Sequence, residues 1–162
     1  MSESEPKLPI AIGADHAGWH TKEAIKSYLE SSGYPVEDVG TWSEESVDYP
    51  DYARKVAETV AAGRAQIGIL ACGTGIGMAI AANKVPGIRA ATAHDPMTAR
   101  AAREHNNANV LTVGGRVVDA VRAVEIVREF LAASFAGGRH QRRIDKISEM
   151  DAARPEKKVS AA

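Results

Sequence analysis

The chain has 162 residues, a formal net charge of −1, an apolar fraction of 44% and a charged fraction of 25%. This length suits one domain with a sizeable core, the near-neutral charge argues against nucleic-acid binding, and no apolar run approaches the ~18 residues of a membrane span. The single cysteine excludes an intramolecular disulfide framework and a cysteine zinc cluster, and the polar, acidic start of the chain is unlike a signal peptide, so we expect a cytoplasmic protein.

Short apolar runs alternate with helical patterns along the chain. The runs typical of buried strands are residues 9–13, 36–39, 67–71, 88–93 and 110–113. Helices are predicted from apolar spacing, from Pro at a first turn and from Gly at an end, at about 19–32, 50–63, 79–84, 95–105, 117–131 and 139–150. Strands separated by helices in this way favour a parallel sheet.

The predicted fold is a single-domain α/β protein, a doubly wound five-stranded parallel sheet of Rossmann-like type with a C-terminal helical extension. The domain spans residues 9–150, and residues 1–8 and 151–162 are expected to be flexible ends. Ligands of such folds bind outside the carboxyl ends of the strands. The acids, bases and cations expected there are Asp15, His16, Cys72, His94, Asp95 and Arg116.

Residues 70–78 place a thiol, a hydroxyl and three glycines between an apolar strand and a helix former. Strand, glycine loop and helix together aim main-chain N–H groups at one point, which favours an anionic guest. The loop is not a Walker A motif, because Met78 follows Gly77, and it lacks the G-x-G-x-x-G spacing of dinucleotide sites. We interpret it as an anion cradle; a tight turn without a ligand is the alternative.

Cys72 opens this glycine loop. A lone cysteine beside a buried strand is commonly a small core hydrophobe. Its place at the end of the strand, before a helix whose N-terminal field favours a thiolate, indicates instead a base or a nucleophile. Both interpretations stay open on the local sequence.

Histidines mark two other segments. His16 follows Asp15 in the loop after the first strand, where a surface pair is the alternative to a functional role. His105 and Asn106 end the predicted helix 95–105, where helix C-capping explains both residue types equally well.

Arginines supply candidate phosphate ligands. Arg139 and Arg143 are four residues apart and share a helix face, and together with Arg116 they can clamp a phosphate through the fork geometry of guanidinium. A solvated basic patch is the alternative for residues 139–143.

Seven short motifs carry a resemblance to a known family. They are G-A-D-H-A-G at 13–18, D-Y-P at 48–50, C-G-T-G-I-G at 72–77, A-A-N-K at 81–84, E-H-N-N at 104–107, G-G-R at 114–116 and G-R-H-Q-R-R at 138–143. In this order they resemble the type B ribose-5-phosphate isomerases, within the RpiB/LacAB family of sugar-phosphate isomerases. The resemblance covers about residues 9–150.

The resemblance implies interconversion of ribose 5-phosphate and ribulose 5-phosphate, a step of the pentose phosphate pathway, without metal or cofactor. Position by position, Cys72 matches the base that moves the proton between C1 and C2. Residues Gly73, Gly75, Ile76 and Gly77 match the loop that holds the enediolate oxygen, with Thr74 as a further hydrogen-bonding partner. His105 matches the residue that helps to open the sugar ring, and Asn106 its neighbour on the sugar.

The resemblance also assigns the binding residues. Asp15 and His16 match substrate-binding positions, and Arg116, Arg139 and Arg143 match phosphate-binding positions. Family members work as homodimers, often paired into homotetramers, with active sites shared between subunits. Some relatives carry a glutamate at the position of Met78 and lack the cysteine, so this chain groups with the members that use a cysteine.

Two other functions remain open. An isomerase of a six-carbon sugar phosphate, allose 6-phosphate or galactose 6-phosphate, differs only in the size of the pocket. A non-catalytic sugar-phosphate-binding regulator would use the same fold, but it would not need a cysteine beside an anion cradle.

Overall fold

The computed structural model describes residues 6–153, which form a five-stranded parallel sheet between two layers of helices. The strands are β1 (Ile10–Ala14), β2 (Val36–Asp38), β3 (Ile67–Cys72), β4 (Ala90–Thr92) and β5 (Val110–Gly114). The helices are α1 (Trp19–Ser31), α2 (Tyr49–Ala61), α3 (Ile76–Ala82), α4 (Pro96–Glu104), α5 (Ala120–Ala132) and α6 (Arg139–Ala152). The predicted fold class is confirmed.

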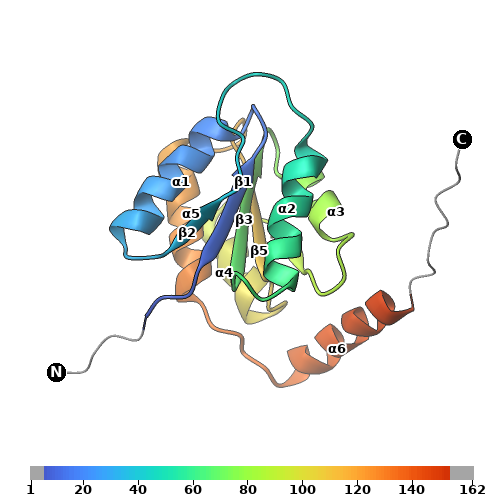
Figure 1. Cartoon of the computed structure of the whole chain (residues 1–162). Helices are drawn as coiled ribbons and strands as arrows, with labels where there is room; N and C mark the ends of the chain where they lie inside the picture. Colours follow the sequence, from blue (N-terminus) through green and yellow to red (C-terminus); the bar gives the residue numbers. More distant parts are fainter. Residues whose placement is uncertain (1–5, 154–162) are drawn as a thin grey trace, which may run out of the picture.

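The order of the strands determines which face each helix covers. The order is β2-β1-β3-β5-β4, and all neighbouring pairs are parallel. The chain moves in one direction across the sheet from β1 to β2 and from β4 to β5, and in the other from β2 to β3 and from β3 to β4. Because such crossovers are right-handed, α1 and α4 lie on one face with α5, and α2 and α3 lie on the other (Figure 1).

Alternate residues of the strands build a separate apolar layer on each face. Ile10 and Ile12 of β1 pack in the cluster that includes residues of α1, α4 and α5. Leu70 and Cys72 of β3 pack in the cluster that includes residues of α2 and α3. This two-residue alternation places the cysteine on the α2/α3 face of the sheet.

Strand β4 is shorter than the predicted 88–93, because the N–H of Ile88 bonds to the Val85 carbonyl of the preceding turn at 3.2 Å and the N–H of Arg89 bonds to the Asn109 side chain at 2.8 Å. Asn83, at the end of α3, accepts the N–H of Ala90 at 2.7 Å and donates to the carbonyl of Ala90 at 3.0 Å. This pair of bonds ties the end of α3 to the first residue of β4.

The predicted start of the helix 117–131 is wrong. Helix α5 begins after Asp119, whose carboxylate accepts the N–H of Arg122 at 2.8 Å and so supplies an N-cap that excludes Val117. Val117 and Val121 are 52% and 72% exposed. The residues that α5 buries are Ala123, Ile126, Val127 and Phe130.

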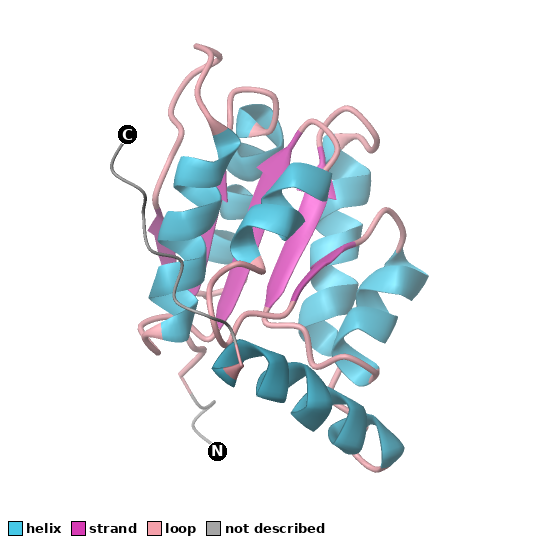
Figure 2. Ribbon diagram, turned by 90° about the vertical axis from the view of Figure 1, so that its right-hand side faces the viewer, coloured by secondary structure: helices cyan, strands magenta, loops and turns pink. Residues whose placement is uncertain are grey.

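Helix α6 lies below the sheet, apart from both helical layers (Figure 2). Of its residues only Ile144 is buried. Contrary to the prediction of a loose end from residue 151, Asp151 belongs to α6 and accepts the N–H of Gly87 at 2.8 Å. The other ends predicted to be flexible lie largely outside the described residues, at 1–5 and 154–162.

Candidate active site

The carboxyl ends of β1, β3 and β5 meet at one edge of the sheet, which we call the carboxyl edge. The register pairs Ala14 with Ala71 and Cys72 with Gly114, so the loops that follow these strands are neighbours. Most of the predicted site residues gather there, namely Asp15, His16, Cys72, Gly73, Thr74, Gly75, Ile76, Gly77 and Arg116.

Asp15 shapes the loop between β1 and α1. Its side chain is 6% exposed, and its Oδ1 accepts the N–H groups of Ala17 and Gly18, both at 3.0 Å. One carboxylate oxygen therefore holds the turn that leads into α1, so a predicted contact to substrate depends on the other oxygen.

His16 is held in one tautomer. Its Nδ1 accepts the main-chain N–H of Val47 at 3.1 Å, so a neutral ring carries its proton on Nε2. The ring is half-buried and can present this Nε2–H as a donor. The partner comes from a loop 31 residues away, which is why sequence spacing could not reveal it.

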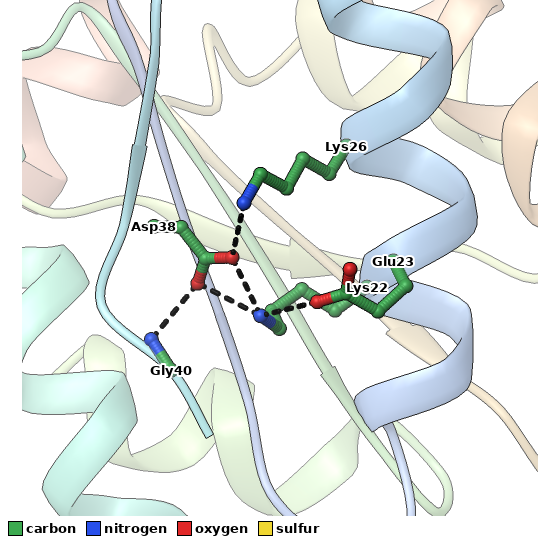
Figure 3. Close-up of polar contacts among 5 residues, drawn as sticks. All are labelled: Lys22, Glu23, Lys26, Asp38 and Gly40. Atoms are coloured by element: carbon green, nitrogen blue, oxygen red, sulfur yellow. Dashed lines mark hydrogen bonds and ion pairs between the residues drawn. The ribbon is translucent and has the colours of Figure 1, made fainter. Parts of the chain in front are cut away.

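A buried charge cluster anchors the start of that loop (Figure 3). Lys22 of α1 is 1% exposed and donates to both carboxylate oxygens of Asp38, at 2.8 and 2.6 Å. Lys26 lies 3.3 Å from the same carboxylate, which also accepts the N–H of Gly40 at 2.9 Å. Glu23 accepts from the Lys22 ammonium at 2.9 Å, so two cations face two anions. The end of β2 is thereby fixed to α1.

The loop from residue 39 to 48 connects this charge cluster to His16. Thr41 donates its N–H to the carbonyl of Ala14 at 2.8 Å, which extends the pairing with β1. The Lys22 ammonium lies 4.4 Å from the centre of the Trp42 ring. Val47 then delivers its N–H to His16 at the other end of the loop. The loop is therefore held at both ends over the carboxyl edge.

Cys72 is buried and turned toward the glycine loop. It is 4% exposed and belongs to the apolar cluster on the α2/α3 face. Its Sγ accepts the N–H of Gly75 at 3.1 Å. A main-chain N–H aimed at sulfur is an arrangement that accommodates a thiolate. The cysteine therefore packs in the core and also faces the predicted anion cradle.

The glycine loop bends sharply before α3. Gly75 has φ +81°, which only glycine adopts without strain, and it forms the N-cap of α3. The exposed Thr74 accepts the N–H of Ile76 on its Oγ1 at 3.3 Å. Within this loop the N–H of Gly75 thus contacts the sulfur and the N–H of Ile76 contacts the Thr74 hydroxyl.

Two large side chains border the loop. A methyl group built on Gly73 would lie 3.2 Å from Nη1 of Arg116, and one built on Gly77 would lie 2.7 Å from the ring of Tyr49. Arg116 therefore reaches over one end of the loop and Tyr49 covers the other. Sequence reasoning assigned no role to Tyr49; its place in the motif D-Y-P at 48–50 was the only signal.

Four other predicted site residues lie at the other edge, where the strands begin; we call it the amino edge. Helix α4 starts after β4 and returns across the sheet, so its C-cap residue His105 comes shortly before the start of β5. His105 and Asn106 are exposed there, as are Arg139 and Arg143 at the start of α6. These four side chains are separated from Cys72 by the length of the strands.

His140 joins the two segments of the amino edge. Its ring stacks on that of His105, with centroids 4.7 Å apart and an angle of 17° between the planes. Desolvation lowers the pKa of His140 below its usual value, and the positive charges of Arg139, His105 and Arg143 lower it further. The amino edge is therefore a crowded cationic surface.

A groove of about 330 Å³ runs between α6 and β4 at the amino edge. Asn106 contributes to it, together with Arg89, Ile147 and Asp151.

Across residues 6–153, no three His, Cys, Asp or Glu side chains gather in a way that could hold a metal ion. None of the helices in the same range has the length and hydropathy needed to cross a membrane.

Comparison with known proteins gives consistent matches over nearly the whole chain. A family model described as Ribose/Galactose Isomerase matches residues 10–147. The chain is 48% identical to ribose-5-phosphate isomerase B of Escherichia coli over 142 residues, which are 88% of this chain and 95% of that protein.

Solved structures agree with the sequence matches. A ribose-5-phosphate isomerase B of Clostridium thermocellum superposes with a TM-score of 0.88 at 51% identity, covering 90% of this chain and 98% of that one. The Mycoplasma genitalium ribose-5-phosphate isomerase B, whose structure contains bound ribulose 5-phosphate, superposes with a TM-score of 0.86 at 43% identity, covering 90% and 97%.

Proposed function

The chain belongs to the ribose/galactose isomerase family and is an isomerase, and on this premise we propose that it interconverts D-ribose 5-phosphate and D-ribulose 5-phosphate through an enediolate. The observation that carries the proposal is the Cys72 sulfur, 3.1 Å from the Gly75 N–H, at the edge that also holds Asp15, His16 and Arg116. The bound ribulose 5-phosphate in the Mycoplasma relative supports this substrate.

The chemistry requires a base and a site for negative charge. In the open-chain aldose, the Cys72 thiolate takes the proton from C2, and the electron pair forms the C1–C2 double bond while negative charge develops on the C1 oxygen. The N–H groups of residues 73–77 and the Thr74 hydroxyl stabilise this oxygen. The thiol then returns the proton to C1, and the O2 proton moves to O1, which leaves the ketone. Such a base typically accelerates proton transfer by ~10²–10⁴-fold.

The cationic and polar residues bind and prepare the sugar. His16, with its proton on Nε2, and Asp15 contact the substrate beside the glycine loop. Arg116, Arg139 and Arg143 hold the phosphate. Binding at this distant group aligns C1 and C2 with the base. His105 assists ring opening, with Asn106 on the sugar.

The positions of these residues support a site formed by two copies of the chain. Cys72 and Arg116 occupy the carboxyl edge, whereas His105, Arg139 and Arg143 occupy the amino edge of the same chain. A single sugar phosphate reaches both sets only if the amino edge of one copy meets the carboxyl edge of another. A two-fold homodimer satisfies this twice.

The cytoplasmic location predicted from the sequence stays a prediction.

The substrate is tested by measuring kcat/KM with ribose 5-phosphate, allose 6-phosphate and galactose 6-phosphate, before and after alkylation of the single cysteine. We expect the highest kcat/KM with ribose 5-phosphate, and we expect alkylation of the cysteine to abolish this activity. A higher value with a six-carbon substrate would reassign the enzyme to that sugar. Turnover of none of the three would favour a sugar-phosphate-binding regulator.

The shared site is tested by mixing inactive variants. Cys72→Ala and His105→Ala are each expected to be strongly impaired, but half of randomly formed dimers are mixed, and each mixed dimer contains one intact site. Co-refolded chains should therefore recover about a quarter of the wild-type activity. Verified mixed dimers without activity would contradict a shared site.

A further inference from the structure

Thr112 is a polar side chain in the middle of a strand that is buried along its whole length. It lies in β5 between Leu111 and Val113, and all three are 0% exposed. Its Oγ1 donates to the carbonyl of Gly75 at 2.8 Å. The bond joins residues 37 positions apart and connects the core of the sheet to the glycine loop.

Counting donors and lone pairs defines the network. The Gly75 carbonyl also accepts the N–H of Ala79, the first bond of α3, at 3.1 Å. Together with Thr112 this fills the two lone pairs of the oxygen. The hydroxyl of Thr92 lies 2.7 Å from that of Thr112 and 3.3 Å from the carbonyl, and it has one proton. Thr92 therefore donates to Thr112, and Thr112 donates to Gly75.

Both ends of Gly75 are thus held. Its N–H points to the Cys72 sulfur, and its carbonyl points to Thr112. The peptide that bears this carbonyl also bears the N–H of Ile76, which is directed to Thr74. Because a peptide is planar, fixing its oxygen fixes its N–H. Helix α3 has only seven residues, so helical hydrogen bonds alone hold the loop weakly.

We propose that Thr112 is a positioning residue for the isomerisation: with Thr92 as its own donor, it holds the Gly75 carbonyl, and thereby the Ile76 N–H of the same peptide and the turn at Gly75, whose own N–H faces the Cys72 sulfur. The proposal rests on the proposed function. Thr112 does not contact the substrate, so its removal lowers the rate of proton transfer rather than the affinity for the sugar phosphate.

The test compares Thr112→Val with Thr112→Ser. Valine has the same shape but leaves the Gly75 carbonyl without its buried donor, and we expect kcat to fall by about 10- to 100-fold, with KM for ribose 5-phosphate changed by less than about threefold. Serine keeps the hydroxyl and should restore kcat to within about threefold of the wild type.

Thr59→Val is the matched control. Thr59 is also buried, at 3% exposure, and its hydroxyl donates to the carbonyl of Lys55 within α2, away from the loop. We expect this variant to lose stability without a change in kcat. An equal loss of kcat in Thr59→Val and Thr112→Val would overturn the proposal, as would a folded Thr112→Val enzyme with kcat within twofold of the wild type. If Thr112→Val does not fold, Thr92→Val is measured instead. We expect a smaller loss of kcat in this variant, and an unchanged kcat would contradict the proposal.

A second measurement separates this proposal from the proposed function. The ¹H–¹⁵N resonance of Gly75 reports its hydrogen bond to the sulfur whether or not the chain turns over any sugar. We expect it to shift and to exchange faster with solvent in Thr112→Val, but not in Thr112→Ser or Thr59→Val. If the wild-type protein were inactive, the proposed function would fail, but the Gly75 resonance would still test the positioning role of Thr112. An unchanged Gly75 resonance in Thr112→Val overturns that role.

Discussion

Asp15 and Cys72 at the carboxyl edge are held very differently from the predicted site residues at the amino edge. At the carboxyl edge, Asp15 and Cys72 are 6% and 4% exposed, and each accepts main-chain N–H groups from its own loop. At the amino edge, His105, Arg139 and Arg143 are exposed, and the helix that carries the two arginines buries a single residue. Contacts within the chain hold Asp15 and Cys72 of the carboxyl edge in place, whereas the exposed residues of the amino edge are left to be positioned by a bound ligand or a second copy of the chain.

The distance between the edges gives this contrast a functional meaning. The five steps along β3, at about 3.3 Å each, separate its ends by roughly 16 Å. Buried, bonded groups are suited to chemistry, which depends on fixed geometry, and exposed cations are suited to capturing an anion that arrives with its own charge. Variants at each edge can therefore show whether the two edges divide the work in this way.

Cys72→Ala should show the largest effect. Removing the base leaves the binding residues in place, so we expect kcat to fall by ~10²–10⁴-fold or more while the affinity for ribose 5-phosphate stays within a few-fold. Stopped assays give kcat, and calorimetric titration gives the affinity. Near-normal turnover by the variant would refute the role of the sulfur.

Lys22→Met should show that the carboxyl edge depends on buried charge. Removing one partner of a buried pair typically costs ~3–5 kcal/mol, and we expect about 3 kcal/mol because Lys26 and the Gly40 N–H still face Asp38. Urea unfolding measures the free energy of unfolding. The control is Arg54→Met, which breaks an exposed ion pair on α2 and should change stability little. Equal losses in both variants would contradict the special role of burial.

Arg139→Ala should reverse the pattern of Cys72→Ala. Losing a charge-assisted hydrogen bond to phosphate costs about 1.5–3 kcal/mol, so KM for ribose 5-phosphate should rise about 10- to 100-fold with kcat less affected. Because Arg139 is exposed, the melting temperature should not change. Arg142→Ala, in the same exposed run, is the matched control. An equal rise in KM for both variants would support the solvated basic patch instead of a specific clamp.

The sequence was informative where local pattern decides structure. Apolar runs and glycine stops predict the five strands, and the loops that follow them lead to Asp15, Cys72 and Arg116 because parallel strands end at one edge. The direction of α4 also follows from the alternation of elements. His105, at its end, therefore belongs at the opposite edge.

Contacts between distant segments could not be predicted. A threonine at position 112 fits an ordinary β-branched strand, and nothing local indicates that it holds the Gly75 carbonyl. The bond from Val47 to His16 depends equally on tertiary structure. The valine at 117 misled the helix assignment because the N-cap at Asp119, not the apolar spacing, determines where α5 starts.

His140 should give the smallest effect and the most direct test of crowding at the amino edge. Desolvation and the nearby charges of Arg139, His105 and Arg143 hold its pKa in the folded protein below the usual value near 6.5. The folded state thus binds fewer protons than the unfolded state as pH falls through 6.5. The contribution of His140 to the free energy of unfolding is therefore complete above that pH and is lost below it.

His140→Phe keeps an aromatic ring against His105 but cannot take up a proton. The loss of unfolding free energy between pH 7.5 and pH 5 should therefore be smaller in the variant than in the wild type, as urea unfolding at the two pH values measures. Inorganic phosphate should reduce the same loss in the wild type, since a bound anion offsets the arginine charges that disfavour protonation. A pH dependence identical in both proteins would mean that the cations of the amino edge are too well solvated to act on one another.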